Sequence, residues 1–325
     1  MSQRNRLQWI DNLRGFSILL VILGHTLQYF SADFDNDHVA NYIYAFHMPL
    51  FFIISGFCAG YSVSSFRKTL LKSSIQLLAP YVIWTLFLCL TLNLNFLESI
   101  IIRPRYWFLL VLFVVRMVTA LSQHLSKKHK NFEFVFYLIF TLVLAIAHLV
   151  FKINILCINV FYYYLIFYLV GYYLNRNYEN LALVSKNNYV IFVLAVIYAG
   201  WGFVFHRGVT PEPIAFLPGF LYTIPLALVG SLLFILLFAR FLDRELKLLN
   251  FFGVHSLGIY VVSGMICWNL VVYLPQLVVI ASQNMLLVYL LFIAICVISG
   301  AFVKSLSLIN WARPLIGLKY IRREK

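Results

Sequence analysis

The sequence predicts an all-α integral membrane protein, a bundle of about ten transmembrane helices. Of its 325 residues, 63% are hydrophobic and only 11% are charged, whereas soluble domains carry about 25% charged residues. The mean hydropathy is +0.90. Because so few charged side chains are present to cover a water-exposed surface, we expect the chain to lie in a lipid bilayer.

Apolar windows of about 20 residues, the length that spans a bilayer, recur along the whole chain. We expect the first window to be retained as a helix rather than removed as a signal peptide, because it is long and lacks a small-residue cleavage site. No segment between the windows is long enough for a soluble domain, so residues 1–325 are expected to form one domain. The windows are 13–31, 42–62, 73–94, 106–123, 134–151, 154–174, 188–205, 216–239, 254–275 and 285–303.

The net charge is +14, and the Lys and Arg residues behind it are unevenly distributed between alternate loops. Most Lys and Arg fall in segments that share one side with the two termini, and only Arg103, Arg105, Lys152 and Arg207 fall on the other side. The positive-inside rule therefore places both termini in the cytoplasm. The basicity is explained by topology and by anionic membrane lipids, so we expect no nucleic-acid partner. The five cysteines lie in apolar runs without metal-ligand spacing, so we expect no metal site.

Ionisable side chains inside the apolar windows are the first candidates for function, because charge is costly in lipid. Arg14 and His25 both lie in the first window, about three helical turns apart, so they share a helix face at a separation of about 16 Å. Asp11, three residues before Arg14, can lie on the same face. A cation near the cytoplasm and an imidazole deeper in the membrane suit a long substrate with an anionic head, such as a coenzyme A thioester.

Four further residues are candidates for binding. His47 starts the second window, where an antiparallel hairpin brings it to the depth of His25. Trp107 opens the fourth window beside Arg105, and an aromatic ring next to a cation suits a sugar. Arg116 lies further along the same window.

Each of these residues also has a simpler interpretation. Arg14 and Arg116 can extend to the cytoplasmic interface, and His25 can bond a neighbouring helix. His47 can bond backbone groups freed by the adjacent proline, and Trp107 can belong to an interfacial aromatic belt. Their grouping around one expected cavity favours a functional site.

Several segments resemble a known family. "WIDNLRGFSILLVILGH" (9–25) is similar to the opening signature of the acyltransferase family 3 membrane proteins, in which Arg or Lys is followed after ten residues by His. "FHMPLFFIISGF" (46–57), "YWFLLVLF" (106–113), "FYYYLIFYLVGYYL" (161–174), "FFGVHSLGIY" (251–260) and "ARPLIGLK" (312–319) resemble its later landmarks in order. Ser263 stands where members often have a further His.

The resemblance implies a ten-helix enzyme of the bacterial inner membrane that moves an acyl group, usually acetyl, from acyl-CoA to a hydroxyl of a sugar or envelope polysaccharide precursor. Acetyl-CoA or another acyl-CoA is the implied co-substrate, and no permanently bound cofactor is expected. The other expected partners are a sugar or lipid-linked glycan acceptor and membrane lipids. Arg14 and His25 match the family's functional pair.

We expect His25 to act as general base on the acceptor hydroxyl, and Arg14 to hold an anionic or polar part of the donor. Asp11 is expected to orient Arg14, and His47 to position the acceptor or stabilise the developing oxyanion. An acyl-histidine intermediate is a less favoured variant.

Two other classes remain open. The first is a transporter or flippase for a lipid-linked sugar, although such proteins usually place carboxylates or broken helices near the midplane, and all 11 acidic residues here fall in loops or near window ends. The second is a noncatalytic membrane scaffold, which fits the hydrophobicity but not the grouped ionisable residues.

Overall fold

The computed structural model describes residues 7–60, 65–126, 132–153, 155–204 and 219–319, and within these ranges the regular structure is helical throughout. Arg207 and the two chain ends lie outside them. The helices are α1 (Gln8–Phe30), α2 (His38–Gly60), α3 (Phe66–Ser73), η1 (Ser74–Leu78), α4 (Ala79–Leu92), η2 (Glu98–Ile102), α5 (Trp107–Leu125), α6 (Phe132–Leu149), α7 (Ile158–Arg176), α8 (Tyr178–Ser185), α9 (Asn188–Val204), α10 (Gly219–Phe241), α11 (Lys247–Val254), α12 (Ser256–Tyr273), α13 (Pro275–Ser282), α14 (Met285–Leu308) and η4 (Asn310–Ile316).

The all-α membrane class is confirmed, and each of the ten apolar windows coincides with a helix. Seven described helical segments are long and apolar enough to cross a membrane, and the pair α8 and α9, bent by 83°, would add an eighth. The count of ten is therefore approximate. Helix α6 contributes only a shorter apolar stretch, and α7 is not among the seven.

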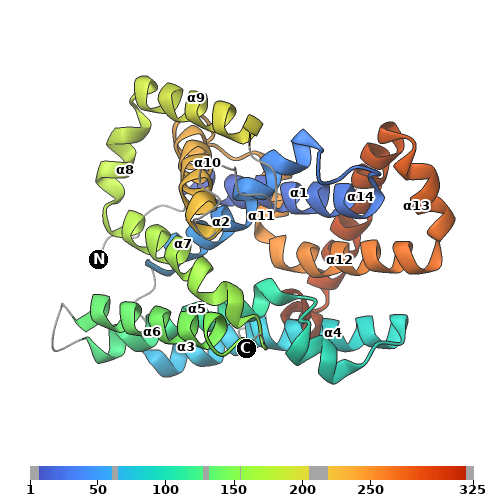
Figure 1. Ribbon diagram of the computed structural model, residues 1–325, viewed down its shortest axis with the longest axis horizontal. Helices are drawn as coiled ribbons and strands as arrows, with labels where there is room; N and C mark the ends of the chain where they lie inside the picture. Colours follow the sequence, from blue (N-terminus) through green and yellow to red (C-terminus); the bar gives the residue numbers. More distant parts are fainter. Residues whose placement is uncertain (1–6, 61–64, 127–131, 154, 205–218, 320–325) are drawn as a thin grey trace.

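Helix α1 lies at the centre of the fold, in contact with α2, α10, α11, α12 and α14. Figure 1 shows it between the α7–α9 group and the α12–α14 group, with α3–α6 along one side of the molecule. Asn12 fixes the start of α1, since its Nδ2 donates to the carbonyl oxygens of Leu242 and Arg244 at 2.8 and 2.7 Å.

Two glycines allow α1 and α11 to meet backbone to backbone. A Cβ at Gly15 would overlap the carbonyl oxygen of Leu249, and a Cβ at Gly253 would overlap that of Asp11. Because only glycine permits this approach, the crossing fixes the rotation of α1 about its axis. That rotation decides which way the neighbouring Arg14 points.

Segments α3, η1 and α4 form one continuous helical run, Phe66–Leu92, with a π-helical turn at Ser74–Leu78. Pro80 follows the turn, lacks the N–H that would bond residue 76, and clashes with that carbonyl in a regular α-helix. A π turn accommodates such a proline, and π turns are frequent at functional sites. Gln76, inside the turn, faces two of the cavities described below.

Candidate active site

Three cavities follow one another through the bundle. The first, the basic mouth, is lined by Arg14, Lys72, Arg116, Lys319 and neighbouring side chains. The central cavity shares Arg14, Gln76 and Arg116 with it. The third, the His25 cavity, meets the central cavity at Tyr260. The three cavities form a path from a group of cations to an imidazole.

Helix α1 runs along this path. Arg14, Ile18 and Val21 line the central cavity, and His25 lines the next one. These positions recur at the three- and four-residue spacing of a single helix face. Arg14 and His25 are therefore presented on the same side of α1, at different depths.

The basic mouth is a cavity of about 290 Å³ in which four cations converge. Lys72 is close enough to Lys319 and Arg116 for electrostatic interaction. No carboxylate occurs among the described residues that line the cavity. Four cations around a pocket of this size, of which Arg14 is paired with Asp11, suit an anion with several charges, such as a phosphate ester.

Asp11 is the nearest described anion to Arg14. Its Oδ1 lies 3.9 Å from Nη1 of Arg14, and the carboxylate is largely buried while the guanidinium is about 29% exposed. The pair holds the Arg14 side chain toward the cavities. This geometry is compatible with the orienting role expected for Asp11.

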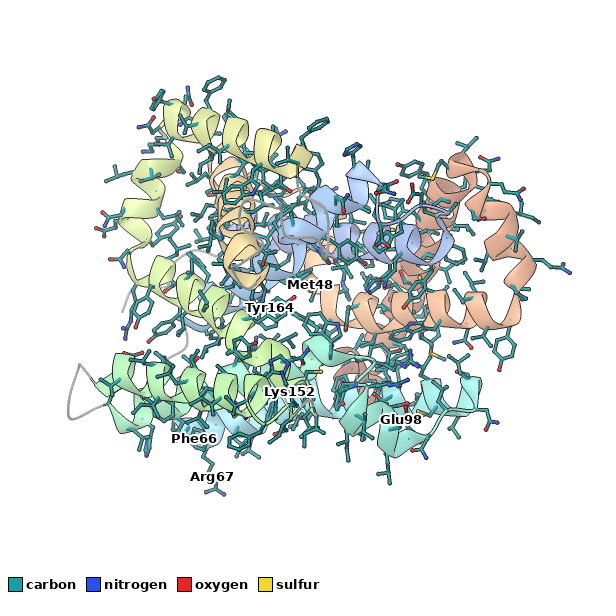
Figure 2. The ribbon with its side chains drawn as sticks, in the orientation of Figure 1. Met48, Phe66, Arg67, Glu98, Lys152 and Tyr164 are labelled. Carbon is teal, nitrogen blue, oxygen red and sulfur yellow. The ribbon has the colours of Figure 1, made fainter. Side chains whose placement is uncertain are left out.

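The central cavity has a smaller volume than the basic mouth, about 180 Å³, and most of the residues that line it are apolar. Met48 and Phe108 line it together with Leu112 and Ile18. In Figure 2, Met48 lies in the middle of the molecule. The small volume and largely apolar lining of the central cavity suit a flexible chain rather than a ring system with many polar groups.

The His25 cavity is the largest of the three, about 540 Å³. Its lining combines aromatic rings with two arginines, Arg103 and Arg105. Aromatic faces beside hydrogen-bonding groups can hold a polyhydroxylated ring. The cavity is large enough for a sugar residue beside the imidazole.

His25 is only partly buried as a residue, but its Nδ1 atom is buried and has no hydrogen-bond partner among the described residues. Its ring lies 6.4 Å from that of Tyr29, centroid to centroid. Trp268 Nε1 donates to the Tyr29 hydroxyl at 2.5 Å. The imidazole thus borders the cavity, and its Nδ1 forms no hydrogen bond to the described residues.

His47 does not line any of these three cavities. It is buried, and its Nδ1 lies 2.8 Å from the carbonyl oxygen of Ile43, to which it must donate. The two imidazoles of His25 and His47 are nevertheless close enough to interact electrostatically. His47 thus lies outside the three cavities, with its Nδ1 bonded to the backbone of its own helix.

The remaining candidates divide between the two ends of the path. Arg105 and Trp107 line the His25 cavity. The Arg105 guanidinium lies 6.0 Å from the Trp268 ring, and Trp107 stacks on Tyr164 at 5.2 Å. Arg116 lines the basic mouth and the central cavity, so it points into the protein rather than along the lipid.

Sequence reasoning missed several lining residues. Lys72 and Lys319 were counted only as topology signals, and nothing in the sequence links two lysines so far apart in the chain. Tyr29 follows His25 by one helical turn, a spacing that did contain the information. Ser263, which stands where family members often have a further His, is buried. Its hydroxyl donates to the Tyr260 carbonyl oxygen at 3.2 Å.

The fold and the cavities define a multi-pass membrane protein with a series of internal cavities. A family model described as an acyltransferase domain matches residues 7–305. The chain therefore belongs to this acyltransferase family, and the resemblance noted in the sequence is confirmed.

Two curated relatives share a shorter segment. The chain is 40% identical over 86 residues to the nodulation protein NolL of Sinorhizobium fredii, and 38% identical over 86 residues to the nodulation protein NolL of Mesorhizobium japonicum. Each match covers 25% of this chain, and 24% and 23% of the respective relatives. No solved structure matches.

Proposed function

We propose that the protein transfers an acyl group, most simply acetyl, from acyl-CoA bound at the basic mouth to a hydroxyl of a sugar or envelope glycan precursor in the His25 cavity. The series of cavities from four cations to one imidazole is the observation that supports this. Coenzyme A has phosphates at one end and a thioester at the other, joined by a flexible arm. The arm would lie in the narrow central cavity.

The chemistry follows from the order of these groups. The phosphates bind Arg14, Lys72, Arg116 and Lys319, which leaves the thioester about 16 Å further along α1, beside His25. His25 accepts the proton of the acceptor hydroxyl as its oxygen attacks the thioester carbonyl carbon. The tetrahedral intermediate collapses with cleavage of the carbon–sulfur bond. The products are an O-ester and coenzyme A, whose thiolate takes up a proton.

The acceptor side is assigned by the aromatic lining. Trp107 and Trp268 offer faces on which a sugar ring can stack, and Arg105 offers charge-assisted hydrogen bonds to its oxygens. In this proposal the enzyme lies in the bacterial inner membrane with both termini in the cytoplasm. The basic mouth then opens toward cytoplasmic acyl-CoA.

The direct test uses inverted membrane vesicles, which expose the cytoplasmic face to added acetyl-CoA. Wild-type vesicles are expected to release free thiol and to esterify envelope glycans, seen as a mass increase of one acetyl group per site. The double variant Lys72→Gln/Lys319→Gln should raise the acetyl-CoA KM at least about 100-fold, since each of the two lost charge-assisted hydrogen bonds contributes about 1.5–3 kcal/mol and about 1.4 kcal/mol corresponds to tenfold.

Lys152→Gln is the matched control, because this exposed lysine lies at the α6–α7 turn and lines none of the three cavities. The proposal fails if the double variant and the control have the same KM. Movement of a lipid-linked sugar without thiol release would instead support the transporter class.

A further inference from the structure

The central cavity and the His25 cavity meet at one side chain. Among the described residues, Tyr260 alone lines both. On α12, Ser256 and Leu257 precede it and line the central cavity, whereas Gly264 and Trp268 follow it and line the His25 cavity. Helix α12 thus runs along the path as α1 does, with the tyrosine at the junction.

The Tyr260 ring is held in that position by other aromatic rings. It packs edge-to-face against Phe108 at 5.5 Å and against Tyr106 at 6.1 Å. Its hydroxyl interacts with the backbone of Phe108 in the first turn of α5. The side chain is 7% exposed. These contacts fix a bulky ring across the place where the two cavities approach each other.

The acceptor side of the junction is bordered by the side chains of Tyr106 and Trp268. A Cβ at Gly264, one helical turn after Tyr260, would meet no atom nearer than 3.6 Å. The atoms that such a Cβ would contact belong to the side chains of Trp268 and Tyr106. Displacement of the Tyr260 ring toward the acceptor cavity therefore requires these side chains to shift.

We propose that the Tyr260 ring is a partition between the donor and acceptor cavities, displaced only when the acyl arm reaches His25. The inference rests on the proposed function. A thioester that waits beside a water-filled acceptor cavity is exposed to hydrolysis, in which a water oxygen attacks the carbonyl carbon, the carbon–sulfur bond breaks, and carboxylate and thiol are released. The ring keeps the water of the acceptor cavity from the thioester until the acyl arm moves past the ring to His25.

The test compares hydrolysis with transfer. Full-length protein in proteoliposomes without glycan is given acetyl-CoA, and thiol release measures hydrolysis. The same variants in inverted vesicles measure acetyl transfer to envelope glycans. Tyr260→Ala should raise the hydrolysis-to-transfer ratio at least about tenfold, because water then reaches the thioester. Tyr260→Phe keeps the ring and should hydrolyse at the wild-type rate.

Tyr198→Ala is the matched control for loss of a buried tyrosine. Tyr198 is 8% exposed and donates to the Tyr42 carbonyl oxygen at 2.7 Å, and it lines none of the three cavities. If Tyr260→Ala does not accumulate, Tyr260→Leu gives the same readout with an apolar side chain smaller than the ring.

The outcomes separate the two proposals. An unchanged hydrolysis-to-transfer ratio in Tyr260→Ala or Tyr260→Leu, with wild-type protein active in transfer, would overturn the partition. So would an equal rise in Tyr198→Ala. Absence of acetyl transfer by the wild-type protein would instead refute the proposed function.

Discussion

His25 differs from the other polar side chains of α1 in how its polar atoms are satisfied. Ser17 and Thr26 donate to carbonyl oxygens one turn earlier in their own helix, Leu13 at 2.7 Å and Ile22 at 2.8 Å. The buried Nδ1 of His25 has no such partner among the described residues. A buried polar atom left unpaired is costly. The proposed role of His25 as general base would account for this cost.

Replacement of His25 tests this at the residue scale. His25→Ala should lower acetyl transfer at least about 100-fold, the usual contribution of a positioned general base, while the protein still accumulates in the membrane. Transfer is measured in inverted vesicles at equal protein amounts. Thr26→Val, one residue away and facing away from the cavities, should keep wild-type transfer. Wild-type turnover in His25→Ala would refute the assignment.

Arg14 is expected to act on binding rather than on the chemical step. Arg14→Ala removes a charge-assisted contact to the donor and should raise the acetyl-CoA KM about tenfold with a smaller change in kcat. Asp11→Asn removes the partner that orients Arg14 and should give an intermediate KM. Steady-state thiol release over a range of acetyl-CoA concentrations separates the two parameters. A pure loss of kcat in Arg14→Ala would contradict the binding role.

At the scale of the elements, the long apolar helices were predictable because each corresponds to a run of hydrophobic residues in the sequence. The short helices α8, α11 and α13 were not, since each is only 8 residues long and borders a longer apolar window. Their positions depend on tertiary contacts such as the Gly15–Leu249 approach. Pro80 was a sequence signal for the π turn that precedes it. The position of that turn along the helix depends on packing against neighbouring helices.

Helices α2 and α7 cross so closely that glycine is required at both contact points. A Cβ at Gly171 would overlap the carbonyl oxygen of Ile53, and a Cβ at Gly56 would overlap that of Tyr168. Gly171→Ala should therefore destabilise the protein by about 2 kcal/mol, within the usual range for overpacking. We expect a lower melting temperature in detergent for this variant, measured by fluorescence.

Gly200→Ala is the matched control, because no atom lies within 4 Å of the Cβ position at Gly200 in α9. It should leave the melting temperature unchanged or raise it slightly, since alanine favours a helix more than glycine does. Equal melting temperatures for the two variants would show that the α2–α7 crossing is not tightly packed.

At the scale of the whole molecule, the sequence indicated which residues deserved attention but not how they divide between sites. Arg14 and His25 were placed on one face by helical periodicity alone. Arg116 was a binding candidate and Lys72 only a topology signal, and the packing of α3 against α5 brings both to the same cavity as Lys319. The bond of His47 to Ile43 could not be predicted, because it depends on rotamer choice, which a sequence pattern does not contain.

The orientation in the membrane is the last property to test, since the proposed route requires the basic mouth to face the cytoplasm. Arg67 at the start of α3 and Lys152 at the α6–α7 turn are exposed and fall on opposite sides in the charge pattern. Figure 2 shows the Arg67 side chain projecting away from the molecule. Each position is changed to cysteine in a background without the five native cysteines.

We expect a membrane-impermeant maleimide to label Lys152→Cys in intact inner-membrane spheroplasts and to label Arg67→Cys only after the membrane is opened. In inverted vesicles the pattern should reverse. Opposite labelling would place the four cations on the outer side, where acyl-CoA is absent, and the donor would then have to enter from the His25 cavity. The chemistry at His25 would survive such a result, but the assignment of the basic mouth to the donor phosphates would not.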